Sequence, residues 1–133
     1  MGQQQLLLIV LSVIIIGIAI VIALSLIEEN QAETNKDGIY ADNINIASLA
    51  QQYFKRLKML GGGEFSFVGF RIPSPLLETE NGYYSATGAS EGEILITGIG
   101  KVQDTDGKVY KIETKVTNYE IKTISVTKIT PGE

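Results

Sequence analysis

The sequence predicts an α+β fold in which one long N-terminal helix packs, through its C-terminal half, on an antiparallel sheet of four or five strands. An uninterrupted apolar run lies near the N-terminus, a segment with helical periodicity follows it, and short alternating segments separated by turn signals fill the second half. We expect a hydrophobic helix over 1–27 and a globular domain over 28–133. Within that domain, an amphipathic helix should span about 28–60 and the sheet about 64–130.

The apolar run extends from Leu6 to Ile27, and no charged side chain precedes Glu28. As a helix it would be about 33 Å long, which matches the hydrocarbon core of a bilayer. Ser12 and Ser25 are the polar residues within this run. We expect their hydroxyls to bond to carbonyls one turn earlier, so the segment can still span a membrane. The run is too long for a cleaved secretory signal and lacks basic residues before it. We therefore predict a membrane-spanning helix with the C-terminal domain outside the cytoplasm.

The next segment carries an apolar stripe at helical spacing. Because nothing between the run and the stripe stops a helix, we predict one helix from about Gln4 to Met59, softened near Asp37–Gly38, where glycine costs about 1 kcal/mol relative to alanine. Gly61–Gly63 should end it. The stripe predicted to pack on the sheet comprises Ile39, Ile46, Leu49, Ala50, Tyr53, Leu57 and Leu60.

The second half of the chain reads as short strands because apolar residues alternate and glycine-containing turn signals separate the segments. Asn81–Gly82, Glu91–Gly92 and Asp106–Gly107 are such signals. They predict an antiparallel meander whose apolar side packs on the helical stripe. The predicted strands are Phe65–Ile72, Tyr83–Thr87, Glu93–Ile99, Val109–Thr117 and Tyr119–Ile129.

Composition argues against catalysis and nucleic-acid binding. The chain has no cysteine and no histidine, which removes disulfides, thiolate metal sites and most nucleophile–base pairs. The net charge of -4 gives no reason to expect nucleic acid as a partner. We expect no enzymatic activity, no cofactor and no metal. Asp104–Gly107 is similar to the start of a calcium loop, but a strand follows it, so we expect an ordinary hairpin turn.

An apolar N-terminal helix that continues into a helix covered by a C-terminal antiparallel sheet resembles the type IV pilins and the related pseudopilins, over nearly the whole chain. The resemblance implies a structural subunit of an extracellular filament. Such a subunit is first inserted in the inner (cytoplasmic) membrane and then polymerises with copies of itself, aided by pilus assembly machinery. The residues implied to form the polymerisation core are Leu6, Leu7, Leu8, Ile9, Val10, Leu11, Val13, Ile14, Ile15, Ile16, Gly17, Ile18, Ile20, Val21 and Ile22.

The extreme N-terminus departs from the family pattern of a basic leader ending in glycine and a glutamate as the fifth mature residue. Gln5 takes the place of that glutamate if Met1 is the first mature residue, and Leu7 takes it if Met1–Gly2 is a leader. Gln3, Gln4 and Gln5 form a polar cap. Their amides either hydrogen-bond neighbouring N-termini in a filament or lie at the membrane interface.

Charge along the helix is segregated. Lys55, Arg56 and Lys58 lie about 35 Å beyond an acidic stretch made of Glu28, Glu29, Glu33, Asp37 and Asp42. In a staggered bundle the two regions of different copies would meet. The alternative is that both are solvated faces, since exposed ion pairs contribute only about 0–1 kcal/mol.

Two other functions stay open from the sequence. A pseudopilin of a secretion system would form a short periplasmic fibre by the same means. A single-pass anchored binding module would use the helix only as a tether, and it would remain monomeric in detergent rather than form ordered polymers.

Overall fold

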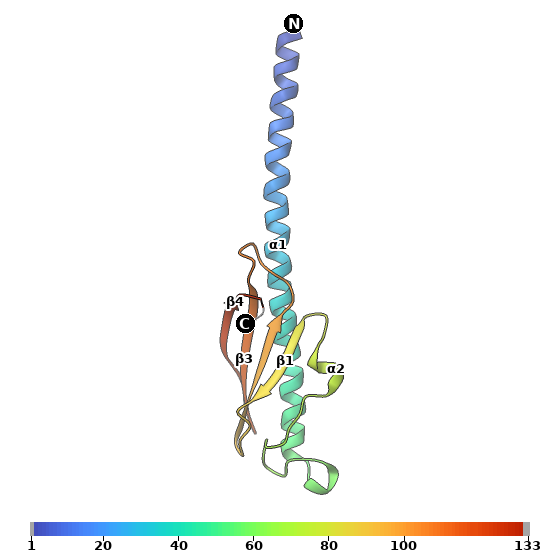
Figure 1. The fold of residues 1–133 in the computed structure, drawn as a ribbon, viewed down its shortest axis with the longest axis vertical. Coiled ribbons are helices and arrows are strands. Elements are labelled where there is room, and N and C mark those ends of the chain that lie inside the picture. The colour runs from blue at the N-terminus through green and yellow to red at the C-terminus, as the bar shows by residue number, and fades with distance from the viewer. Residues whose placement is uncertain (1, 132–133) are drawn as a thin grey trace.

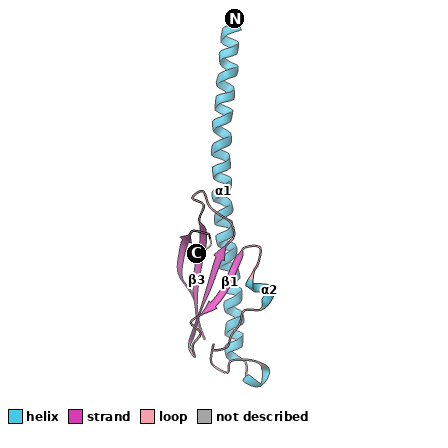
Figure 2. Ribbon diagram, viewed as in Figure 1, coloured by secondary structure: helices cyan, strands magenta, loops and turns pink. Residues whose placement is uncertain are grey.

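The computed structural model describes residues 2–131 and combines one very long helix with a small sheet (Figures 1 and 2). The helix projects far beyond the sheet at its N-terminal end. The elements are α1 (Gly2–Lys55), a 3₁₀ turn η1 (Lys58–Leu60), α2 (Ser74–Leu77), β1 (Gly82–Thr87), β2 (Glu93–Gly100), β3 (Val109–Thr117) and β4 (Ile121–Ile129).

The sheet is an antiparallel meander in the order β1-β2-β3-β4. Each strand pairs with the strand that follows it in the sequence. A bulge interrupts the β3–β4 register between Glu113 and Thr114. α1 packs against β2 and β3. The predicted α+β class, with a sheet of four or five strands on the second half of the helix, is confirmed.

α1 is unbroken at Gly38, so the expected softening of the helix there is wrong. A methyl group at Gly38 would lie 2.5 Å from Oδ1 of Asn81, just before β1. The glycine therefore permits a close approach between the helix and the start of the sheet, which a side chain would prevent.

α1 ends at Lys55 rather than at the predicted Met59. After it the chain turns back on the helix end, and the amide of Gly63 donates to the carbonyl of Tyr53 at 2.8 Å. Gly61, in the left-handed conformation, closes η1 instead of α1. The carbonyls of the last helical turn thus find partners in the returning chain, which satisfies the helix end without further turns.

The predicted packing stripe is therefore only partly buried. Ile39, Ile46 and Ala50 are almost fully buried, whereas Leu49 and Tyr53 are half-buried. Leu57 and Leu60 are 49% and 69% exposed, so their assignment to the helix–sheet contact is wrong. Both lie past the end of α1, where the helical spacing on which the prediction depended no longer applies. The buried residues of α1 are Ala32, Asn35, Ile39, Asn43, Ile46, Ala47, Ala50 and Phe54.

The predicted strand at 65–72 is absent, and this segment is a series of turns. Glu64 and Phe65 adopt left-handed backbone conformations, with φ of 48° and 64°, which an extended strand does not permit. Phe67 is nevertheless fully buried, with its ring centroid 4.8 Å from that of Phe54. The apolar alternation there reflects core side chains of a loop, Phe67 and Ile72, and not a strand face.

Candidate functional site

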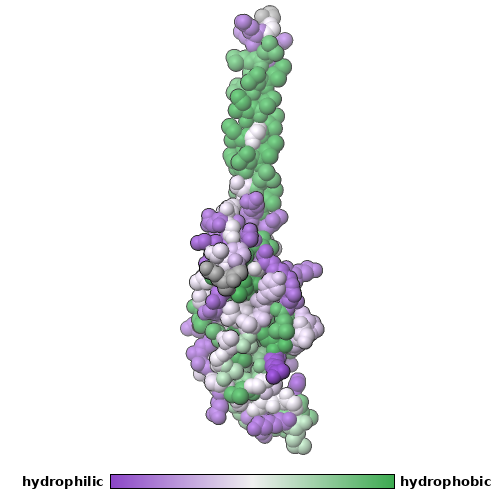
Figure 3. All heavy atoms as spheres, viewed as in Figure 1, coloured by the Kyte–Doolittle hydropathy of each residue, from purple (hydrophilic) through white to green (hydrophobic). Residues whose placement is uncertain are grey.

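Residues Leu6–Ile27 of α1, termed the apolar rod, form the largest apolar surface of the protein in the space-filling view (Figure 3). Their large hydrophobic side chains are between 50% (Leu11) and 69% (Leu7) exposed. All the residues predicted to form a polymerisation core lie on the rod. The helix is long and apolar enough to cross a membrane, and no part of this stretch is buried.

The rod is apolar around its whole circumference. A helix of this kind requires an apolar environment on every side, either lipid or other protein. The hydroxyls of Ser12 and Ser25 donate to the carbonyls of Leu8 at 2.7 Å and Val21 at 3.1 Å, which confirms the predicted bonds to the preceding turn. These two serines therefore expose little unsatisfied polarity on the rod.

Small residues lie within the rod, and polar residues precede it. A methyl group at Gly17 would meet nothing within 4 Å, so this position is a shallow notch on the rod's surface. Ala19 and Ala23 add two more small side chains on the same segment. At the far end, Gln3, Gln4 and Gln5 are exposed within the first turns of α1, where they form the predicted polar cap.

A hydrogen-bonded carboxylate fixes the rod-bearing helix to β1. Asp42 Oδ2 accepts from Tyr84 Oη at 2.5 Å, Thr79 Oγ1 at 2.9 Å and Asn81 Nδ2 at 3.0 Å. Burial raises the pKa of Asp42, but the three hydrogen bonds outweigh it, so the pKa lies below its ordinary value. Burial and the nearby carboxylate raise the pKa of Tyr84. Asp42 is thus a contact within the domain, so of the five carboxylates in the predicted acidic stretch this one is held by residues of its own chain.

Two asparagines of α1 bind the sheet in the same region. Asn35 Nδ2 donates to the carbonyl of Asn81 at 2.7 Å. Asn43 Nδ2 donates to the carbonyl of Ile112 at 3.1 Å and to Thr114 Oγ1 at 3.2 Å. Asn35 and Asn43 are almost fully buried, so these bonds form in a low dielectric, where they fix the helix register on the sheet.

Glycines of β2 make room for these helix side chains. A methyl group at Gly98 would lie 2.6 Å from Ile39 Cγ2 and 2.8 Å from Asn43 Oδ1. One at Gly100 would overlap Asn35 Oδ1. The helix lies on a strand without side chains at these two positions, which brings its backbone close to the sheet.

Charged and aromatic groups join the opposite edge of the sheet to the helix. Lys128 on β4 forms an ion pair of 2.5 Å with Asp104 and lies 5.3 Å from the centroid of the Tyr110 ring. Lys36 on α1 lies 5.5 Å from the same centroid. The ion pair with Lys128 lowers the pKa of Asp104, and it raises the pKa of Lys128.

The Asp104–Gly107 segment is a turn, as predicted. Oδ1 of Asp104 accepts from the amides of Asp106 at 2.9 Å and Lys108 at 3.2 Å, and Oδ2 pairs with Lys128. Both carboxylate oxygens thus have partners within the turn and from β4. Among residues 2–131, the structure groups no three acidic side chains closely enough to hold a metal ion.

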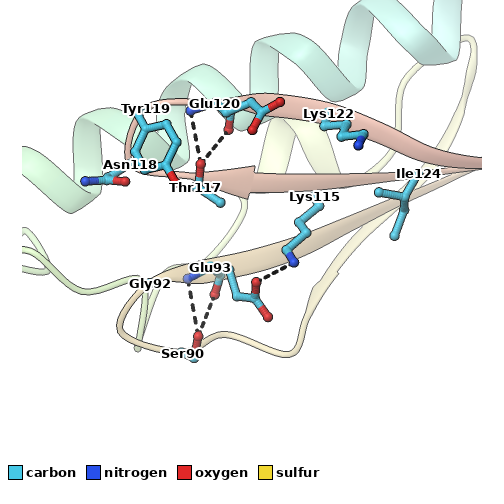
Figure 4. Close-up of a pocket in the computed structure, with 10 residues that line it drawn as sticks. All are labelled: Ser90, Gly92, Glu93, Lys115, Thr117, Asn118, Tyr119, Glu120, Lys122 and Ile124. Carbon is cyan, nitrogen blue, oxygen red and sulfur yellow. Dashed lines mark hydrogen bonds and ion pairs between the residues drawn. The ribbon is translucent and has the colours of Figure 1, made fainter.

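A hollow with a volume of about 730 Å³ lies at the end of the sheet away from the apolar rod (Figure 4). Ser90 Oγ and Thr117 Oγ1 exchange hydrogen bonds with the backbone of Glu93 and Glu120, which closes two turns. Lys115 pairs with Glu93 at 2.7 Å. The hydroxyls of Ser90 and Thr117 are therefore engaged in local turn contacts.

Sequence reasoning missed the polar residues of the helix–sheet contact. Asn35 and Asn43 lie four residues before and after Ile39, so all three lie on the face of the helix that packs on the sheet. The predicted packing stripe contained only apolar residues and aromatic residues, so it left the two asparagines out. The alternation of Gly98 and Gly100 in β2 was a second available signal, because glycine inside a strand often marks close approach of another backbone.

Comparison with known proteins gave no match to any family model, curated protein or solved structure. The architecture is therefore the observation that relates this chain to others: a long apolar N-terminal helix packed on a four-stranded antiparallel sheet is compatible with a pilin-like arrangement.

Proposed function

We propose that this chain is a structural subunit of an extracellular type IV pilus-like filament that polymerises through the apolar rod. The observation that carries the proposal is the unbroken passage of α1 from a rod that is exposed and apolar on all sides into a domain that holds it by buried contacts. A tether needs only an apolar span. A helical polymer also needs a rigid connection, because each rod must take the same orientation relative to its domain.

The energetics permit the rod to exchange lipid for other copies at little cost. Burial of apolar surface contributes about 25 cal/mol per Å², so transfer of the whole rod into water is strongly unfavourable. Transfer into a bundle of identical rods keeps these side chains out of water, and packing at Gly17, Ala19 and Ala23 then allows close approach between helices. The precursor would span the cytoplasmic membrane, and the polar sheet domains would cover the outside of the filament.

Electron microscopy of material sheared from the cell surface, together with mass spectrometry of the mature N-terminus, tests this function. We expect long uniform filaments whose protein is this chain. A short fibre confined to the periplasm would indicate a pseudopilin. Monomers that stay in the membrane fraction and disperse in detergent would contradict the proposal and favour an anchored binding module.

Cross-linking through the rod provides a second test, since the chain has no native cysteine. Ala19→Cys should give covalent dimers on oxidation of the surface fraction, because rods of neighbouring copies would be in contact. Thr87→Cys, at the exposed end of β1, is the matched control and should remain monomeric. Equal yields of dimer from both variants would contradict a bundle of rods.

A further inference from the structure

The end of the domain farthest from the rod carries a surface that combines cations and exposed apolar side chains. We term it the basic tip. Met59 is 94% exposed and Phe65 is 70% exposed, so two large apolar side chains face solvent at this end of the domain. Within residues 2–131, the four ion pairs use Lys101, Lys111, Lys115 and Lys128, not the cations of the tip. The basic tip comprises Lys55, Arg56, Lys58, Met59, Leu60 and Phe65.

The loop of the tip is held in a defined shape. A methyl group at Gly62 would overlap the carbonyl oxygen of Arg56, so the returning chain is in direct contact with the end of α1. Phe65 has a left-handed backbone, its amide donates to the carbonyl of Phe54 at 2.7 Å, and its ring lies edge-on at 5.9 Å from the Phe54 ring. A strained backbone that holds an exposed aromatic ring indicates a surface prepared for contact.

The opposite charge lies on α1 near the start of the domain. Glu29, Glu33 and Asp37 recur every fourth residue, so they lie along one side of the helix. All three are exposed, whereas the intervening Ala32 and Asn35 are buried against the domain. We term these three carboxylates the acidic row. They lie directly after the apolar rod.

We infer that the basic tip of one copy contacts the acidic row of a second copy in the assembled filament. This inference rests on the proposed function. Charge complementarity identifies the occupant, because the same chain carries both the cations and the carboxylates on exposed surfaces. The two surfaces differ and lie at different heights, so the contact is head-to-tail and open-ended, which extends a filament instead of closing a dimer.

The helix geometry sets the displacement between the two copies. Glu33 and Lys55 lie on one continuous helix, at a separation of about 33 Å along its axis. Two parallel copies that bring these residues together must therefore be offset by about 33 Å. At this offset Met59, which follows Lys55 on the side away from the rod, lies alongside the second copy's domain and not alongside its apolar rod.

Charge reversal of the full chain tests the contact. Lys55→Glu with Arg56→Glu should lower the yield of sheared filaments about tenfold, because attractive pairs become repulsive. Added Glu29→Lys and Glu33→Lys should restore the yield to near the original value. Lys108→Glu with Lys122→Glu changes net charge equally at exposed sites outside the basic tip, and this control should assemble normally. Circular dichroism of each variant checks that the domain is folded.

A disulfide between copies tests the pairing directly. Residues 33 and 55 are too far apart for a disulfide within one chain, which needs Cα atoms less than about 7 Å apart. The double variant Glu33→Cys/Lys55→Cys should therefore give a ladder of covalent oligomers on oxidation of filaments, and each single variant should remain monomeric.

Any of four results would overturn the inference. Normal yield from the tip-reversal variant, or absence of a ladder in intact filaments, would reject this contact and leave the filament proposal standing. Binding of each variant to anionic lipid vesicles separates a second explanation. If the compensating lysines fail to restore assembly and the tip variant also loses vesicle binding, the basic tip contacts a membrane surface and not a second copy. Absence of filaments from the unmodified chain would reject both proposals.

Discussion

The hydroxyl of Tyr84 on β1 donates a hydrogen bond of 2.5 Å to Oδ2 of Asp42 on α1. Thr79 and Asn81 donate to the same oxygen from the segment that precedes β1. One carboxylate therefore joins the middle of the long helix to the first strand and its entry turn. This contact, with the Asn43 bonds to β3, fixes the orientation of the rod relative to the sheet.

Tyr84→Phe should lower the free energy of unfolding by about 1–3 kcal/mol, because it removes a hydrogen bond to a charged group and leaves the ring in place. Thermal unfolding in detergent, followed by circular dichroism, measures the change. Tyr83→Phe on the outer face of the same strand is the control, and its effect should stay within about 0.5 kcal/mol. Equal effects of the two substitutions would contradict the role of the Asp42 contact.

The Asp42 contact should also weaken in acid. Burial raises the pKa of this carboxyl, but the hydrogen bonds from Tyr84, Asn81 and Thr79 lower it by more, so the pKa lies below the ordinary 3.8. A carboxyl whose pKa is depressed by folding contributes its stabilisation fully above the unfolded pKa, and loses it as the pH falls through the folded value. The difference in melting temperature between the original chain and Asp42→Asn should be largest near neutrality and shrink below pH 3.8.

Gly98→Ala should destabilise the domain by about 1–3 kcal/mol, because the new methyl group would meet Ile39 and Asn43 of α1. Gly92→Ala is the matched control, because this glycine has open space around it and its φ lies outside the left-handed region. Chemical denaturation of both variants measures the difference. A Gly98→Ala variant as stable as the control would show that the helix does not lie so close to β2.

Asn43→Asp keeps the shape of the side chain but replaces a donor by a carboxylate facing the carbonyl of Ile112. Burial of this charge without a donor should destabilise the domain by several kcal/mol at neutral pH. Protonation of the new carboxyl in acid should recover part of the loss. Unfolding measured at pH 7 and at pH 4 checks the direction, and a loss that grows toward acid would contradict this account.

Gln5→Leu should lower filament yield about fivefold if the amides of the polar cap hydrogen-bond neighbouring N-termini, since each such bond contributes about 1 kcal/mol. Gln103→Leu, an exposed glutamine of the β2–β3 connection, is the control. Quantitative blotting of sheared filaments measures both yields. Unchanged assembly of Gln5→Leu would favour a cap that lies only at the membrane interface.

The sequence predicted the elements that have a strong period and failed where backbone conformation or tertiary contact decided the outcome. The run at 6–27 and the meander of β1–β4 follow from composition and alternation. The segment at 65–72 alternates equally well, but left-handed residues at Glu64 and Phe65 turn it into a loop. The loop's hydrogen bonds to the end of α1 also end the helix before Met59.

The candidate site divides in the same way. The apolar rod was predictable because its chemistry is local and depends on no distant contact. Asp42 was not, since a carboxylate on a helix gives no sign in sequence of three donors that come from residues 79–84. The cations of the basic tip were visible in the sequence, but its exposed apolar side chains were not, because Leu57 and Leu60 fit a helical stripe that the structure ends at Lys55.

Helical reconstruction by cryo-electron microscopy of sheared filaments tests the central claim most directly. We expect a central bundle of apolar rods, surrounded by sheet domains, in which contacting copies are offset by about 33 Å so that Lys55 lies beside Glu33 of another copy. Isolated monomers in detergent, or filaments whose rods lie on the outside, would contradict the account.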